Sequence, residues 1–351
     1  MTNPDAPQDI KDLSRQELAD WLAARDIAPY RADQIMQWIY QHQVDDFARM
    51  TNISKAIRPV LAEHFTIDRL KIRDTRIAAD QTQKFLFELA DGRHIESVLI
   101  PEEGHATLCV STQVGCAQGC RFCLTAARGF IRNLRPGEII AQVRDIEKRV
   151  NPRARLTNIV LMGMGEPLAN FTNVLTALDT ITDGDCGLKY STRRVTLSTA
   201  GLVPRLAELG RATKVNLAVS LNATDNATRD MLMPVNKKYP LEDLLRACAE
   251  YPLSKRRKIT MEYILIRDVN DSEADARRLI RLLRPIRAKV NLIPFNEHPQ
   301  SEFRRPDEAA IQRFKDLLHA HSYTVMTRLS KGAEICAACG QLEADIRQYQ
   351  K

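Results

Sequence analysis

With 351 residues, of which 44% are hydrophobic, the chain can bury a sizeable core and hold two or three domains. Its mean hydropathy is −0.31, and no run approaches the roughly 18 apolar residues of a membrane span, so nothing indicates a membrane protein. The polar, acidic N-terminus predicts no secretion signal, and the 8 unevenly spaced cysteines do not resemble a disulfide framework. We therefore expect a protein of the reducing cytoplasm.

The charge balance is basic, with 51 Lys and Arg residues against 44 Asp and Glu residues and a net charge of +7. Such an excess is compatible with a nucleic-acid partner, because phosphate contacts dominate affinity for nucleic acids, but many basic proteins bind none. The densest basic run is Lys255, Arg256, Arg257 and Lys258, just before an apolar segment. It either touches RNA or forms a solvated surface, and the sequence leaves both open.

Residues 1–65 predict a small helical accessory domain. Ser14 and Glu17 form a capping box that marks a helix start, and Leu18 and Leu22 follow at helical spacing. Residues 30–40 show a second amphipathic helical pattern. A basic unit of this kind is either an RNA-binding adaptor or a packing cap.

Residues 66–104 change to the alternation that is typical of strands, and we interpret them as a β linker. Two alternating runs, residues 84–89 and 93–100, flank Asp91 and Gly92. An Asp-Gly pair between alternating runs predicts a β-hairpin.

Residues 105–322 repeat the order strand, loop, helix. The expected strands are residues 107–111, 158–162, 194–197, 215–221, 259–266 and 289–294. Helix starts are marked by Pro136, Pro204, Pro240, Ser272 and Pro306. Six βα units predict an α/β fold in which a parallel sheet curls into a partial, TIM-like (βα)6 barrel, since a full barrel needs eight units. Residues 323–351 should add a C-terminal strand and a cysteine-bearing loop.

Three cysteines, Cys116, Cys120 and Cys123, form a C-x3-C-x2-C run after the first expected barrel strand. A structural zinc ion takes four protein ligands and a four-iron cluster takes one thiolate per iron, so three thiols leave one position open. An open iron is where a cosubstrate can bind. The spacing, with Phe122 before the third cysteine, resembles that of the radical S-adenosylmethionine (SAM) enzymes. A zinc site or a chance cluster is the alternative.

Polar residues stand at the ends of the later strands, where the loops of a barrel carry its chemistry. Gly165 and Glu166 lie in a Met-Gly-Met-Gly-Glu-Pro turn, where glycine lets the backbone approach a ligand and the carboxylate can hold an ammonium group. The other strand ends carry Ser198, Ser220, Asn222 and Asn296. One such residue is usually a helix cap, but four around one mouth predict a ligand rich in hydrogen-bonding groups.

The remaining cysteines differ in setting. Cys186 and Cys248 fit small, buried hydrophobic residues, and Cys109 lies on the first barrel strand. Cys336 and Cys339 are either half of a zinc site, for which no second pair or His partner is apparent, or include a reachable thiol at Cys339 in a terminal loop.

Seven short motifs in one order resemble the radical SAM adenine methyltransferases of the RlmN/Cfr family over nearly the whole chain. They are C-x3-C-x2-C, G-M-G-E-P, L-S-T-A-G, S-L-N-A, M-P-V-N-K-K-Y-P, N-L-I-P-F-N and A-A-C-G-Q-L. Pro167 favours the RlmN branch, which methylates carbon 2 of adenine, over the Cfr branch, which methylates carbon 8. Cys336 departs from the polar residue that the family usually has there.

The resemblance implies a [4Fe-4S] cluster held by the three cysteines and SAM as cosubstrate. It implies SAM contacts from Gly165, Glu166, Ser198, Ser220, Leu221, Asn222 and Asn296. In the family's scheme one SAM methylates Cys339, and a second SAM generates a radical that activates this methyl group for addition to the ring. Glu96 then removes the ring proton, and Cys109 attacks Cys339, which releases the product and leaves a disulfide.

The resemblance further implies 23S rRNA as a partner, tRNA as a second substrate in some members, and an electron donor such as flavodoxin or ferredoxin. We expect a monomer without membrane association. Two other readings remain open: a zinc-bearing RNA-binding protein, and a radical SAM enzyme that acts on a protein or a small molecule. The six βα units count against the first, and the basic clusters against the second.

Overall fold

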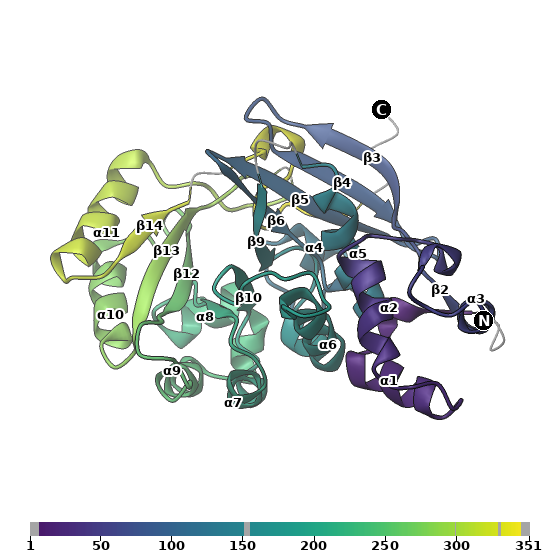
Figure 1. The fold of residues 1–351 in the computed structure, drawn as a ribbon. Helices are drawn as coiled ribbons and strands as arrows, with labels where there is room; N and C mark the ends of the chain where they lie inside the picture. The colour runs from purple at the N-terminus through teal and green to yellow at the C-terminus, as the bar shows by residue number, and fades with distance from the viewer. Residues whose placement is uncertain (1–6, 151–154, 299, 329–330, 345–351) are drawn as a thin grey trace.

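The computed structural model describes residues 7–150, 155–298, 300–328 and 331–344, and one curved sheet of ten strands runs through it (Figure 1). The strand order is β14-β13-β12-β11-β10-β9-β6-β5-β4-β3. From β6 to β14 the neighbouring strands are parallel, whereas β3, β4 and β5 are antiparallel and extend the sheet past β6. The sheet stays open between β3 and β14, so the predicted α/β partial barrel is confirmed.

The parallel part alternates strands and helices as the sequence predicted. In chain order it contains β6 (His105–Cys109), α5 (Pro136–Glu147), β9 (Arg155–Leu161), α6 (Phe171–Thr182), β10 (Val195–Thr199), α7 (Val203–Ala212), β11 (Asn216–Ser220), α8 (Asn226–Leu232), α9 (Leu241–Ala249), β12 (Ile259–Leu265), α10 (Glu273–Leu283), β13 (Ala288–Pro294), α11 (Glu308–Ala320) and β14 (Val325–Thr327). The predicted cap at Ser272 is confirmed, because its side chain accepts a hydrogen bond from the Asp275 N–H.

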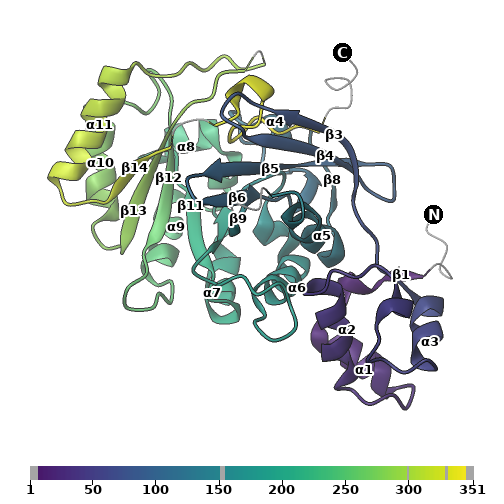
Figure 2. The ribbon, with the colours of Figure 1, turned by 45° about the horizontal axis from the view of Figure 1, so that its top comes forward.

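Buried apolar residues hold this part together. Leu197, Val219, Val290 and Leu292 on neighbouring strands have no measurable exposure. Helices α6, α7, α10 and α11 lie along one side of these strands (Figures 1 and 2), which explains why the strands read as nearly continuous apolar runs. None of the helices in the described ranges combines the length and the apolar character needed to cross a membrane.

The predicted hairpin is confirmed. Strands β4 (Gln83–Glu88) and β5 (His94–Glu102) pair antiparallel around a turn in which Gly92 has a φ of 75°. Strand β3 (Lys71–Ile77) pairs with β4, and β5 pairs with β6, so this segment is continuous with the barrel sheet. The inner faces of β4 and β5 therefore join the inner face of the barrel.

The N-terminal helices form a compact unit beside α5 and α6 (Figure 2). It contains α1 (Arg15–Ala23), α2 (Arg31–Tyr40) and α3 (Ile57–His64), and β1 (Gln8–Asp9) pairs in parallel with β2 (Phe65–Thr66) to close it. The capping box of Ser14 and Glu17 is present as predicted. Leu22 and Ile35 are fully buried in this unit.

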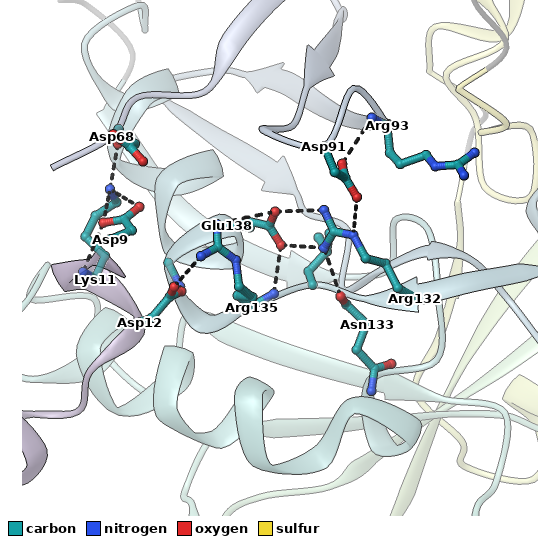
Figure 3. Close-up of polar contacts among 12 residues, drawn as sticks. Asp9, Lys11, Asp12, Asp68, Asp91, Arg93, Arg132, Asn133, Arg135 and Glu138 are labelled. Carbon is teal, nitrogen blue, oxygen red and sulfur yellow. Dashed lines mark hydrogen bonds and ion pairs between the residues drawn. The ribbon is translucent and has the colours of Figure 1, made fainter. Parts of the chain in front are cut away.

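A chain of charged side chains fastens this unit to α5 (Figure 3). One oxygen of the Asp12 carboxylate accepts from the Gly137 N–H at 2.9 Å, and the other accepts from Arg135 at 2.7 Å. The first turn of a helix favours a carboxylate, because its N–H groups lack partners within the helix. Glu138 continues the chain to Arg132 on the barrel side, at 2.8 Å.

We expect Asp12 to make stability depend on pH. Burial raises the pKa of its carboxyl to about 6 from 3.8, although Arg135 and the Gly137 N–H lower it. The folded state therefore holds this proton more tightly than the unfolded state and loses stability as the pH rises from about 4 to about 6. Over this window the free energy of unfolding of the wild type should fall by about 2 kcal/mol relative to that of Asp12→Asn, whose amide does not ionise.

Melting temperatures of both proteins at pH 4, 5, 6 and 7 would measure this difference. Asp20→Asn, on the exposed side of α1, is the control. A gap between wild type and Asp12→Asn that stays constant over this range would contradict a raised pKa at Asp12.

Candidate functional site

A cavity of about 910 Å³, counted with its mouth, lies at the carboxyl ends of the parallel strands. Side chains from separate loops line it, and most of the residues that the sequence predicted for a site are among them. These are Cys116, Cys120, Cys123, Gly165, Glu166, Ser198, Ser220, Asn222 and Cys339. The parallel sheet brings them together because all its strands end on this side.

The three cysteines lie in a loop that a small ribbon closes. Strand β7 (Gln113–Gly115) pairs with β8 (Phe130–Asn133), and the short helix α4 (Leu124–Ala127) follows the third cysteine. The Cys116 N–H donates to the Gly129 carbonyl at 2.9 Å. Burial raises the pKa of the Cys116 thiol to about 12 and also raises the pKa values of Cys120 and Cys123.

This donor set fits an iron–sulfur cluster. Cys116 is buried and Cys120 and Cys123 are partly buried, and burial raises the pKa of all three thiols, so a bound metal would stabilise their thiolate forms. Among the described residues, no group of three His, Cys, Asp or Glu side chains is arranged to hold a single metal ion. A cluster binds each thiolate to a different iron, so it suits thiols that line one cavity without meeting at a point.

The loop after β9 is tightly built. Gly165 has a φ of +100°, and a Cβ atom there would lie 2.5 Å from Cβ of Gln113, so this position needs glycine. Glu166 is buried, and its two carboxylate oxygens accept from the N–H groups of Leu168 at 2.9 Å and Ala200 at 2.7 Å. Burial raises the pKa of Glu166, and these hydrogen bonds lower it.

Sequence reasoning missed two side chains that shape this cavity. Glu262 on β12 lines it, and the Ser198 hydroxyl donates to its carboxylate at 2.6 Å. Arg229 on α8 is fully buried and donates to the carbonyls of Ala200, Ser220 and Leu221, at the ends of β10 and β11. Glu262 could have been recognised in the sequence, because it is the only acidic residue in an otherwise apolar strand. Nothing in the sequence around Arg229 marks it as buried.

Two of the residues predicted to contact SAM, Leu221 and Asn296, are not in the lining of this cavity. Leu221 is fully buried and is absent from the lining of this cavity; its carbonyl accepts from Arg229 at 3.0 Å. Asn296 donates to the Cys339 carbonyl at 3.1 Å and lines a second cavity instead.

The second cavity, of about 1350 Å³, adjoins the first. Cys109, Arg328 and Lys331 line it, and Cys339 lines both cavities. Burial raises the pKa of Cys109 to about 12, and the charge of Cys339 adds to this, whereas Arg328 lowers it. The structure therefore brings Cys109, Cys339 and a cation to one space.

Glu96 is away from both cavities. It is fully buried on β5, forms an ion pair with Lys84 at 3.1 Å and accepts from the Glu343 N–H at 3.0 Å. Neither cavity has Glu96 in its lining. In this conformation its carboxylate holds the C-terminal loop.

The other cysteines follow their predicted settings. Cys186 and Cys248 are buried in the core, as expected, and Cys336 is partly exposed with a φ of 52°. All eight cysteines are free thiols. The basic run at residues 255–258 precedes β12, at the opposite end of that strand from the cavities, which favours a solvated surface.

The chain matches known protein families and a solved structure. A family model described as the ribosomal RNA large subunit methyltransferase N-terminal domain matches residues 8–67, and the radical SAM superfamily model matches residues 110–280. The fold is similar to the crystal structure of a radical SAM methyltransferase from Sphaerobacter thermophilus, with a TM-score of 0.89 and 42% identity over 97% of this chain and 100% of that one.

Full-length relatives carry one name. The dual-specificity RNA methyltransferase RlmN of Desulfosudis oleivorans is 68% identical over 99% of this chain and 94% of its own length. The protein of the same name from Syntrophotalea carbinolica is 52% identical over 96% of this chain and 90% of its own length. Since identity at this level extends over almost the whole of both chains, the protein belongs to the RlmN family of radical SAM RNA methyltransferases.

Proposed function

We propose that this chain places a methyl group on carbon 2 of an adenine in 23S rRNA, and in tRNA next to the anticodon, by way of a methylated cysteine. One observation carries the proposal: Cys339 lines both the cavity of the three cysteines and the cavity of Cys109. A thiol in this place can receive a methyl group on one side and pass it to an acceptor on the other.

The first cavity is the proposed site for the [4Fe-4S] cluster and SAM. When bound, these cofactors supply the methyl group and the one-electron chemistry that an electron-poor ring carbon needs. Cys116, Cys120 and Cys123 would hold the cluster and leave one iron open. The polar side chains of Ser220 and Asn222 line the same space and would orient SAM.

The second cavity is the proposed site for the target adenine. Arg328 lines it and offers positive charge to the phosphates that flank the base, whereas Lys331, also in the lining, is paired with Glu102 at 3.0 Å. Cys109 and Cys339 both line this space, so the Cys109 thiol, once it has lost its proton, can attack the Cys339 sulfur. This attack forms the S–S bond and breaks the bond between the Cys339 sulfur and the methylene carbon, which takes up a proton and leaves as the methyl group of the base. The resulting disulfide takes up two electrons before the next turnover.

A proton-accepting role for Glu96 requires the C-terminal loop to move. Lys84 and the Glu343 N–H occupy its carboxylate in this conformation. A general base must come within hydrogen-bond reach of the proton that it takes. We therefore assign this role only to a state in which Glu343 has left Glu96.

The partners follow from the chemistry. An RNA substrate agrees with the family, and a flavodoxin or ferredoxin would supply the electrons. A monomer is sufficient, because one chain contributes every side chain proposed for catalysis. Cys109 and Cys339 are free thiols here, and the disulfide that they would form in each turnover must be reduced again, which favours the cytoplasm as the location.

The test of the function is an anaerobic reaction of cluster-loaded protein with SAM, a reductant and a 23S rRNA fragment, followed by mass spectrometry of the nucleosides. We expect 2-methyladenosine. 8-Methyladenosine would move the protein to the Cfr branch. No methyladenosine from protein that carries its cluster and cleaves SAM would overturn the proposed substrate.

Two cysteine variants test the two thiol roles. We expect Cys339→Ala to fold, hold its cluster and yield no product, because no thiol remains to carry the methyl group. Cys109→Ala should accumulate a covalent protein–RNA adduct, visible as a shifted band that ribonuclease removes, because the resolving thiolate is missing. Cys248→Ala, in the core, is the control for loss of a buried thiol. Free product from Cys109→Ala at the wild-type rate would exclude its resolving role.

Gly165→Ala tests the SAM site. A side chain there strains a φ of +100° and collides with Gln113, so the loop that lines the cavity must shift. We expect the affinity for SAM, measured by anaerobic calorimetry on cluster-loaded protein, to fall by about tenfold or more. The control is Gly104→Ala, which has a φ of +72° but open space around it. Equal affinities for SAM in Gly165→Ala and Gly104→Ala would contradict the proposal that SAM binds in the first cavity.

A further inference from the structure

The inner face of the antiparallel strands carries a buried charge pair, Lys84 and Glu96, and the proposed chemistry gives no role to Lys84. Lys84 on β4 and Glu96 on β5 are both fully buried, with 3.1 Å between Nζ and Oε1. In the register of the two strands Lys84 is opposite Val98 and Glu96 is opposite Leu86, so the two charges are diagonal neighbours on one face. Val98 is also opposite Cys109 on β6. The pair therefore shares a sheet face with Cys109.

Each member of the pair holds one end of the loop that carries Cys339. Lys84 donates from Nζ to the Cys336 carbonyl at 3.3 Å, and Glu96 accepts from the Glu343 N–H at 3.0 Å. Cys339 lies between these two anchor points. A buried backbone group needs a partner, and a charged partner forms the stronger hydrogen bond.

The middle of the loop is fixed to different elements. The Cys339 carbonyl accepts from Asn296 at 3.1 Å, and the Gly340 carbonyl accepts from the Leu124 N–H, beside the three-cysteine loop, at 2.8 Å. The loop is thus held at its middle by residues at the barrel mouth and at its two ends by Lys84 and Glu96. Its position determines whether the Cys339 sulfur lies on the wall between the two cavities.

A purely structural role would explain less. Two charges lose their hydration when they are buried, and apolar side chains of similar size often give equal or greater stability. What the pair adds is specificity: one charged donor and one charged acceptor, which bind the loop backbone in a single position. Lys84 has no place in the lining of either cavity, so direct contact with substrate does not account for it.

We propose that Lys84 is the positioning residue of the Cys339 loop: together with Glu96 it clamps residues 336 and 343 and thereby sets Cys339 between the two cavities. The clamp itself follows from the contacts in the structure, while its consequence for methyl transfer rests on the proposed function. Opening the clamp at Glu96 is also the movement that would free this carboxylate to accept a proton.

The test compares three variants of the cluster-loaded protein under anaerobic conditions. Lys84→Met removes one anchor. Lys84→Met combined with Glu96→Leu removes both without leaving an unpaired buried charge, so it remains informative if the single variant does not fold. Lys11→Met is the matched control, because Lys11 is equally buried and paired with Asp9 at 2.7 Å, but in the N-terminal unit.

Two readouts separate the clamp from the chemistry. The first is hydrogen–deuterium exchange of peptides that span residues 336–343. The second is the rate at which SAM methylates Cys339, followed by mass spectrometry of the protein without RNA. We expect both Lys84 variants to exchange about tenfold faster and to methylate Cys339 about tenfold more slowly, whereas Lys11→Met changes neither.

Exchange within about twofold of the wild type in the folded double variant would overturn the clamp. Faster exchange with unchanged methylation of Cys339 would show that the clamp does not position the thiol, and would overturn the proposal as well. If the wild type methylates neither Cys339 nor RNA, the proposed function fails, and the exchange data still decide whether the clamp exists.

Discussion

The hydrogen bond from the Leu124 N–H to the Gly340 carbonyl, 2.8 Å long, joins two loops that are far apart in the chain, and the two cavities depend on it. Gly340 has a φ of +84°, and a Cβ atom there would lie 3.1 Å from the Phe122 carbonyl oxygen. The positive φ and the close approach together favour glycine at this position. Arg128 and Glu343 add an ion pair at 3.0 Å between the same two segments. Any shift of the C-terminal loop would change the wall that the two cavities share.

The two cavities differ in charge, which agrees with two different ligands. Two buried carboxylates, Glu166 and Glu262, line the first and suit a ligand with an ammonium and a sulfonium group, as SAM has. The second is lined by Arg328 and by the ion pair of Lys331 with Glu102, so it keeps a net positive charge that suits an RNA phosphate. Cys339 stands where these two environments meet.

The N-terminal unit is attached to the helix that follows the cysteine loop. Helix α5 begins at Pro136, shortly after β8 ends at Asn133, and Asp12 binds its first turn. The buried carboxylate of Asp12 thus connects the family's N-terminal domain to the segment that closes the cluster site. These contacts accordingly set the position of the helical unit relative to the segment that closes the first cavity.

Local sequence patterns were enough to predict the secondary structure and the three-thiol loop. Alternation and helix caps predicted the six strands and the helix starts, and the spacing of Cys116, Cys120 and Cys123 predicted the three-thiol site. These signals are local because backbone geometry and cluster ligation act over a few residues. The family resemblance added Cys109 and Cys339, which the structure brings to one cavity.

The way in which the loop around Cys339 is held could not be read from the sequence. The contacts of Lys84 with Cys336 and of Glu96 with Glu343 span 252 and 247 residues, and no periodicity or motif marks them. The positions of Arg229 and Leu221 could not be predicted either, because they depend on which strand ends lie next to each other in the fold. Burial and ion pairing depend on how distant segments pack. In the sequence Glu96 lies on an ordinary strand, and only the fold shows that it anchors the loop at Glu343.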